Sequence, residues 1–277
     1  MAKAVQLVDR VRSLKPGNKW VLILGVGLAA LIAVAFIKPV PQPQSYHDFA
    51  DKRAVLAIPN GADVFSNLPF IAVGILGLYF TAKPKAGFSA AQQWTYTTLF
   101  AGLVLTGVGS AYYHLAPDNQ RLIWDRLPMT IAMAGFIGAL LVDRFDSKVV
   151  GVVPVLMALG MGSVVQWGVS EQHGHGDLRW YALYQGMVMI LAVELLLMFP
   201  SRLNGTREFA IAAIANLAAK IFELLDVPIY QLGGIVSGHT LKHLSASLGF
   251  IPLVRLVWRW RSYTGPGDKK RAHSVRT

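Results

Sequence analysis

Long apolar runs recur along the chain at intervals that predict membrane-spanning helices. A helix needs about 20 mostly apolar residues to cross the hydrocarbon core of a bilayer. Eight runs approach this length, of which the fourth and seventh are the weakest: 20–37, 64–81, 94–114, 123–142, 149–169, 180–199, 209–224 and 237–258. Tryptophans at several of their ends are typical of the membrane–water interface. The pattern predicts an all-α integral membrane protein with eight spans.

These runs divide the chain into five segments. Residues 1–19 form a basic N-terminus, in which Leu7, Val11 and Leu14 share one face of a short helix that would lie on the membrane surface. The remaining segments are an extra span (20–37), a connection with alternating prolines (38–63), a seven-helix core (64–258) and a basic tail (259–277). The first span also resembles a secretory signal, with a possible cleavage site at residues 33–35. The apolar run continues past this site through residues 36 and 37, which favours a membrane span.

Composition and charge agree with a membrane protein. Charged residues make up 15 % of the 277 positions, below the roughly 25 % of soluble domains. Basic residues concentrate before the first span, after the last span and in alternate connections, so the positive-inside rule places both termini in the cytoplasm. This bias accounts for the net charge of +11. Nucleic-acid binding is not needed to explain it, because the sequence has no soluble module with a basic patch interleaved with aromatic residues. A bacterial inner membrane fits this bias.

Several ionisable residues, which cost free energy inside a membrane, fall at one depth of the predicted bundle. His114 ends the third span, Asp125 begins the fourth, and His239 and His243 begin the eighth. With the predicted orientation, all four lie in the outer half of the membrane. Ionisable groups inside a bilayer are expensive and are functional candidates by default. The sequence therefore predicts one buried polar site in that half.

The spacing of the histidines is typical of a metal site. His239 and His243 stand four residues apart, so both imidazoles face the same side of a helix. With His114 they would supply three nitrogen ligands, and three protein ligands with an open fourth position are the catalytic zinc arrangement. Ser110 lies one turn before His114. The chain has no cysteine, which excludes thiolate ligands, thiol catalysis and disulfides. The alternative is a set of interfacial histidines without a metal.

These motifs resemble those of the alkaline ceramidase family. The stretches that carry the resemblance are Ser110-Ala-Tyr-Tyr-His114, Asp125 on the next helix, and His239-Thr-Leu-Lys-His243 on the last. The wider superfamily of seven-helix membrane hydrolases, which includes the progestin and adipoQ receptors, has the same order of motifs. Residues 58–67, which end in Ser-Asn, resemble the ceramidases more than the receptors. The resemblance covers about residues 46–258.

The resemblance implies an activity and assigns roles. It implies zinc held by His114, His239 and His243, with Ser110 and Asp125 as supporting residues. Such a protein would hydrolyse the amide bond of ceramide or another N-acyl lipid with metal-activated water. Asp125 would transfer the proton and Ser110 would stabilise the oxyanion or orient a ligand. The partner would be a membrane lipid.

The family also holds a calcium ion through an acidic segment. The corresponding positions here are Asp48, Asp51, Asn60 and Asp63. Phe49 replaces the family's tryptophan, and Arg53 intrudes on a site that needs negative oxygen ligands. The alternative is an ion-pair cluster that folds this connection over the metal site.

Other interpretations stay open at this point. A lipid receptor or binding protein would keep the same metal for structure. Lys242 on the last helix would be the Schiff-base residue of a retinal photoreceptor, and a transporter is a further possibility. Lys220, Glu223 and Asp226 either pair with one another or line the cavity. His47, His173 and His175 are expected at the periphery.

Overall fold

The protein is a bundle of helices. A computed structural model describes residues 6, 9–82 and 88–262, and no strand occurs among them. The elements are α2 (Pro16–Phe36), η1 (Gln44–His47), α3 (Gly61–Phe65), α4 (Leu68–Thr81), α5 (Ala90–Leu115), α6 (Asn119–Arg144), η2 (Ser147–Gly151), α7 (Val152–Gln172), α8 (Arg179–Met198), α9 (Thr206–Leu224), α10 (Asp226–Gln231), α11 (Gly238–Leu248) and α12 (Ile251–Ser262). Much of the predicted surface helix, the connection with Lys83 and Lys85, and the basic tail beyond Ser262 lie outside the described residues.

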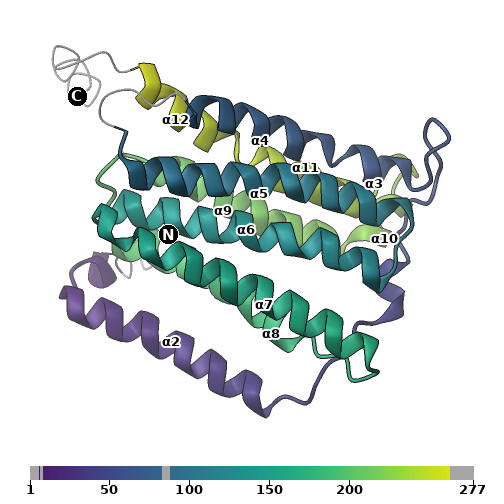
Figure 1. The fold of residues 1–277 in the computed structure, drawn as a ribbon, viewed down its shortest axis with the longest axis horizontal. Helices are drawn as coiled ribbons and strands as arrows, with labels where there is room; N and C mark the ends of the chain where they lie inside the picture. The colour runs from purple at the N-terminus through teal and green to yellow at the C-terminus, as the bar shows by residue number, and fades with distance from the viewer. Residues whose placement is uncertain (1–5, 7–8, 83–87, 263–277) are drawn as a thin grey trace.

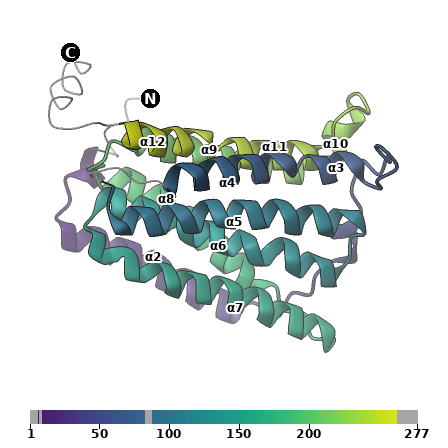
Figure 2. The same cartoon turned by 45° about the horizontal axis from the view of Figure 1, so that its top comes forward.

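The long helices lie side by side along one axis of the molecule. Figure 1 shows α2 at one edge, next to α7 and α8, and the α4 and α12 pair at the opposite edge. In the turned view, α5 and α6 lie between the α4 and α12 pair at one edge and α7 at the other, with α2 behind α7 (Figure 2). The short helices α3 and α10 lie at the same end of the bundle, opposite the end at which α12 finishes.

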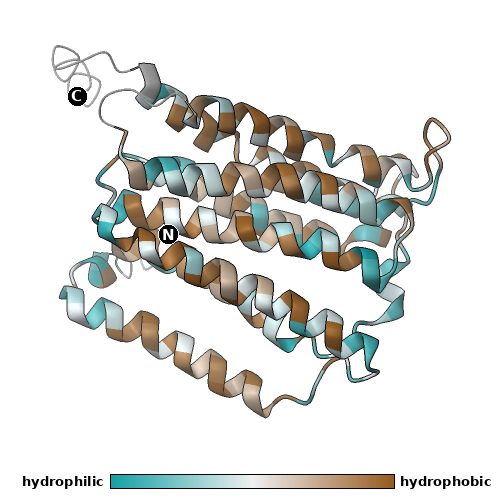
Figure 3. Ribbon diagram, viewed as in Figure 1, coloured by the Kyte–Doolittle hydropathy of each residue, from teal (hydrophilic) through white to brown (hydrophobic). Residues whose placement is uncertain are grey.

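Five of the helical segments are long and apolar enough to cross a membrane: Pro16–Phe36, Gly61–Thr81, Asn119–Arg144, Ser147–Gln172 and Arg179–Met198. Brown apolar residues dominate these helices, whereas polar residues gather near helix ends and connections (Figure 3). The segments are compatible with a multi-pass membrane protein. The eight predicted spans are not all recovered, because α5, α9 and the α11–α12 pair fall outside this group.

Local sequence explains where the site-bearing helices begin and break. The side chains of Ser89, Asp118 and Ser237 each accept a hydrogen bond from a backbone N–H in the first turn of α5, α6 and α11. The predicted second span begins as the separate turn α3, preceded by Asn60 in a left-handed conformation (φ 48°). The predicted eighth span is divided between α11 and α12 at Gly249 and Phe250.

Glycines bring α5 and α6 into backbone contact. A Cβ at Gly102 would lie 2.4 Å from the backbone nitrogen of Ala132, and a Cβ at Gly135 would lie 2.3 Å from that of Leu99. Any side chain at either position would push the two helices apart. This contact fixes the position of α5 relative to α6.

The proline-rich segment, residues 38–60, opens with irregular backbone over residues 38–43 and then turns in η1. It folds back across the end of the bundle, where Val40 O accepts a hydrogen bond from Leu178 N (2.8 Å). Gln42 N donates to the Glu171 carboxylate, and Ala50 N donates to Asp226 (3.0 Å). Tertiary hydrogen bonds therefore fix the path of this segment across the end of the bundle, and Pro43 keeps an extended backbone (φ -61°, ψ 131°).

The α5–α6 contact predicts that Gly135→Ala destabilises the protein by about 1–3 kcal/mol, the usual cost of overpacking. Gly162 on α7 is the control, because a Cβ there meets no atom within 4 Å. Thermal unfolding in detergent should show a lowered midpoint for Gly135→Ala and little change for Gly162→Ala. Equal midpoints for the two variants would mean that α5 and α6 are not in backbone contact.

Candidate metal centre

Three histidines meet at the end of the bundle where α3 and α10 lie. His114 comes from the last turn of α5, and His239 and His243 come from α11. One ligand atom from each lies within 4.8 Å of the others, and the three side chains are buried. Among the described residues this is the only group of three or more His, Cys, Asp or Glu side chains that could hold a metal ion. The structure thus brings together the three ligands predicted from the sequence, which we call the histidine triad.

The hydrogen bonding of the histidine triad fits a bound cation. Nδ1 of His243 lies 2.8 Å from Ser66 Oγ, which leaves Nε2 of that ring to face a metal. Nδ1 of His114 is buried and has no hydrogen-bond partner among the residues that the structure describes. A buried polar atom without a partner costs free energy, and a metal ion would remove this cost. Neutral imidazoles are suitable ligands for zinc, although the donor set alone does not select one metal.

The N-terminus of α11 is held in place by two aspartates. Asp226 Oδ1 accepts the backbone N–H of His239 (2.7 Å), and Asp63 Oδ1 accepts the hydroxyl of Thr240 (2.8 Å). Gly238 permits α11 to approach α9, because a Cβ there would lie 2.3 Å from Phe222 O. These contacts orient the helix that carries two of the three histidines.

Phe49 of the proline-rich segment covers the histidine triad. Its ring centroid lies 4.7 Å from that of His114 and 4.4 Å from that of His239, and its side chain is buried. Sequence reasoning did not give Phe49 a role. The only sequence signal is that it stands where the resembling family has a tryptophan.

Asp125 and Ser110 are buried at the same end of the bundle, as the sequence predicts. Ser110 lies on α5 one turn before His114, and its side chain lies close to the Asp125 carboxylate on α6. The α5–α6 contact keeps this pair together. A buried carboxylate of this kind can accept and release a proton.

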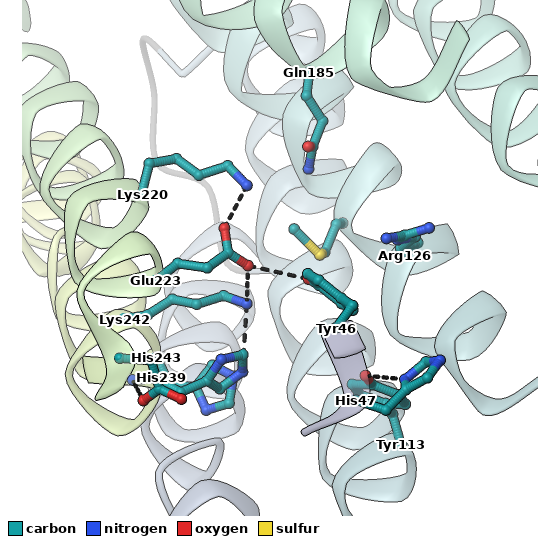
Figure 4. A network of polar contacts seen from close by, with 12 residues as sticks. Tyr46, His47, Tyr113, Arg126, Gln185, Lys220, Glu223, His239, Lys242 and His243 are labelled. Carbon is teal, nitrogen blue, oxygen red and sulfur yellow. Dashed lines mark hydrogen bonds and ion pairs between the residues drawn. The ribbon is translucent and has the colours of Figure 1, made fainter. Parts of the chain in front are cut away.

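Lys220, Glu223 and Lys242 form a charged cluster beside the histidines (Figure 4). Glu223 accepts from Lys220 (2.5 Å), from Lys242 (2.7 Å) and from the Tyr46 hydroxyl (3.1 Å). Burial raises the pKa of Tyr46, so the phenol stays protonated and remains a donor. Asp226 does not join this cluster, because it binds the N-terminus of α11. The predicted pairing along one helix therefore holds for Lys220 and Glu223 only.

The residues predicted for calcium each have a protein partner. Asp48 pairs with Lys52, Asp51 binds Arg53, Asn60 donates to His114 O, and Asp63 binds Thr240. The Arg53 guanidinium donates to both carboxylate oxygens of Asp51 and holds its pKa below the ordinary value. The pairs at Asp48 and Asp51 agree with the alternative, in which ion pairs fold this connection. Calcium binding stays a prediction.

Arg126 of α6 contacts the proline-rich segment and the aromatic rings beneath it in the bundle. Its guanidinium lies over the rings of Trp167 (4.3 Å), Tyr181 (5.0 Å) and Tyr46 (5.5 Å), and it donates to Gln42 Oε1 (2.7 Å). Cation–π contacts of this kind strengthen when the cation is desolvated. Sequence reasoning missed this aromatic cage, because its rings come from three distant parts of the chain.

The peripheral histidines divide into two kinds. His173 and His175 are exposed, as predicted. His47, also expected at the periphery, is instead half-buried. Its ring nitrogens lie 2.8 Å from the Tyr113 hydroxyl and 2.8 Å from Asn119 Oδ1. It therefore holds η1 against α5 and α6.

An apolar cavity of about 110 Å³ lies between the helices that carry the site. Its lining includes Thr106 of α5, Met129 of α6 and Ala246 of α11. These residues are four, four and three positions from Ser110, Asp125 and His243, which is about one helical turn in each case. The cavity therefore begins one turn further into the bundle than the candidate metal centre.

Comparison with protein-family models gives no match, and no curated protein sequence matches the chain.

The Ser66 contact predicts that Ser66→Ala weakens metal binding about tenfold or more, because partners that orient ligating histidines usually have effects of 10–100-fold. The dissociation constant can be measured by competition with a chromophoric chelator. Ser163→Ala on α7 is the matched control, since its hydroxyl bonds only to Gly160 O. Unchanged affinity in Ser66→Ala would show that His243 is not held through this hydroxyl.

Proposed function

We propose that this protein is a zinc-dependent lipid amide hydrolase of the alkaline ceramidase type, which cleaves ceramide or a similar N-acyl lipid within the membrane. The observation that carries the proposal is the histidine triad, buried at the end of an apolar helical bundle. Asp125, Ser110 and the apolar cavity support it, because together they supply a proton carrier, a hydrogen-bond donor and a place for an acyl chain.

Three histidine nitrogens leave a fourth position open, as in catalytic zinc sites. When bound there, zinc would lower the pKa of a coordinated water toward about 7 and supply a nucleophile at neutral pH. His114, His239 and His243 would hold the ion, and Ser66 would orient His243 through Nδ1.

Hydrolysis adds water to the amide carbonyl, breaks the C–N bond and releases a fatty acid and an amine. Asp125 would take the proton from the attacking water and pass it to the leaving amine nitrogen. Ser110 would donate a hydrogen bond to the oxygen on which negative charge develops. The proximity of Ser110 to Asp125 places both groups at one depth of the bundle.

The apolar cavity suits an acyl chain. Its lining is almost wholly apolar, with side chains such as Phe70, Leu103, Val188 and Phe250. A chain that lies in this cavity would have its carbonyl near Ser110 and Asp125, one turn away along α5 and α6. Phe49 and the proline-rich segment would then shield the reacting amide from water.

The proposed location is a bacterial inner membrane, with eight spans and both termini in the cytoplasm. The distribution of basic residues along the chain supports this orientation. The histidine triad would then lie in the outer half of the bilayer.

The second candidate is a lipid-binding protein or receptor with a structural metal. The close packing of Phe49 on His114 and His239 favours it, because a covered metal has less access to water. Full metal occupancy without turnover of any N-acyl lipid would select this candidate.

The proposed role of Asp125 predicts that Asp125→Asn lowers turnover by about 10²–10⁴-fold, the usual contribution of a general acid–base residue. Metal content should stay at the wild-type level, because Asp125 is not among the three ligands. Release of fatty acid from ceramide and other N-acyl lipids gives the rate, and elemental analysis gives the metal. Wild-type turnover in Asp125→Asn would exclude it as the proton carrier.

A further inference from the structure

Lys242 has no part in the proposed hydrolysis, yet its ammonium lies beside the histidine triad. It stands between His239 and His243 on α11, and its side chain is only 17 % exposed. Its Nζ lies 2.7 Å from Glu223 Oε1 and 3.4 Å from His239 Nε2 (Figure 4). A buried ammonium is costly, so the reason for a lysine here needs explanation.

The hydrogen-bond donors of Lys242 exceed the acceptors that the protein offers. An ammonium has three N–H donors. Glu223 takes one of them, while the contact to His239 Nε2 is long and needs a free lone pair on that nitrogen. Glu223 has little capacity left, because it also accepts from Lys220 and Tyr46. Lys242 can therefore bind a further acceptor.

The charge of the cluster favours an anion as that acceptor. Lys220 and Lys242 face a single carboxylate, Glu223, which leaves one positive charge in excess. On α6, Asp125 also interacts with Lys242, whereas Arg126 adds a further positive charge and is already packed among aromatic rings, so this part of the site keeps one positive charge in excess. Asp226 and Asp63 keep their negative charge, but they lie at the N-terminus of α11, where the helix dipole and its N–H groups favour a negative charge: Asp226 accepts two backbone N–H groups, and Asp63 accepts from Thr240 and Ser237.

The charged cluster lies on the side of the site away from the deep part of the apolar cavity. Along α9, the cavity-lining Ala213 and Asn216 come first, and Lys220 and Glu223 follow one and two turns later. Along α11, Lys242 precedes Ala246 of the cavity lining by one turn. An acyl chain in the cavity would therefore place the amine part of an N-acyl lipid near Lys220 and Lys242.

We propose that the substrate carries an anionic group, a carboxylate or a phosphate, on the amine side of its amide, and that Lys242 binds this group with Lys220 at the rim. This inference rests on the proposed hydrolase function. It makes Lys242 a specificity-determining residue, and it favours N-acyl lipids with an acidic amine portion over neutral ceramide.

Three lipids with the same acyl chain test the proposal: N-palmitoylethanolamine, N-palmitoylglycine and N-palmitoylphosphoethanolamine. We expect kcat/KM of the zinc-loaded, full-length protein to be about tenfold or more higher for at least one anionic lipid, the usual effect of a charged hydrogen bond. The better of the two anionic lipids identifies the anion as a carboxylate or a phosphate.

Lys242→Met should remove this preference, whereas Lys242→Arg should retain part of it. Lys148→Met is the control, because it removes the same charge from an exposed position on η2. Lys242→Gln, which is polar and nearly isosteric, replaces Lys242→Met if the latter loses its metal or its thermal transition. Equal kcat/KM for the three lipids in the wild type, or an equal loss for all three in the variant, would overturn the proposal.

A separate measurement distinguishes failure of the anion site from failure of the proposed hydrolase activity. If no lipid is hydrolysed, affinities of the same three lipids can be measured by displacement of a fluorescent fatty acid. A preference for the anionic lipids that Lys242→Met abolishes would support the anion site while refuting the hydrolase. Equal affinities would refute the anion site as well.

Discussion

Three imidazoles buried among apolar helices need partners for their nitrogens, and the end of the bundle is organised around this requirement. Burying a polar group without a partner costs about 1–3 kcal/mol. Ser66 satisfies Nδ1 of His243, whereas Nδ1 of His114 has no partner within the described part of the chain. The backbone that presents His239 is held by Asp226. A metal ion is the partner that would satisfy the remaining nitrogens together.

The layer above the histidine triad excludes water and carries charge. Phe49 packs on two of the imidazoles, and the segment that carries it is fixed by Arg126 and by Asp226. The Arg126–Gln42 contact is buried, so its electrostatic part is stronger than at the surface. Lys242 lies in this layer next to His239, where its charge acts directly on whatever occupies the centre.

Much of the site was predictable because helical periodicity is local. The spacing of His239 and His243 puts both rings on one side of α11, and Ser110 and His114 share a face of α5 for the same reason. The ends of the apolar runs also matched most helix positions. The exceptions are the breaks at α3 and at Gly249, where the backbone leaves the helix within an apolar run.

The parts that sequence reasoning missed depend on contacts between distant segments. The prolines indicate local backbone shape only, whereas hydrogen bonds to Leu178, Glu171 and Asp226 decide that residues 38–60 cross the end of the bundle. The Glu223–Lys242 ion pair joins α9 to α11, and no periodic pattern in the sequence predicts it. The run at 94–114 does correspond to a helix, α5, although α5 is not among the segments that are apolar enough to count as membrane-spanning.

The most direct test of the central claim is the metal content of the detergent-purified protein, measured by elemental analysis. The account predicts about one zinc ion per chain in the wild type and almost none in His239→Ala. His173→Ala, which changes an exposed histidine, should keep the wild-type content. A folded wild type without metal, or full zinc occupancy in His239→Ala, would contradict the assignment of the histidine triad as a metal centre.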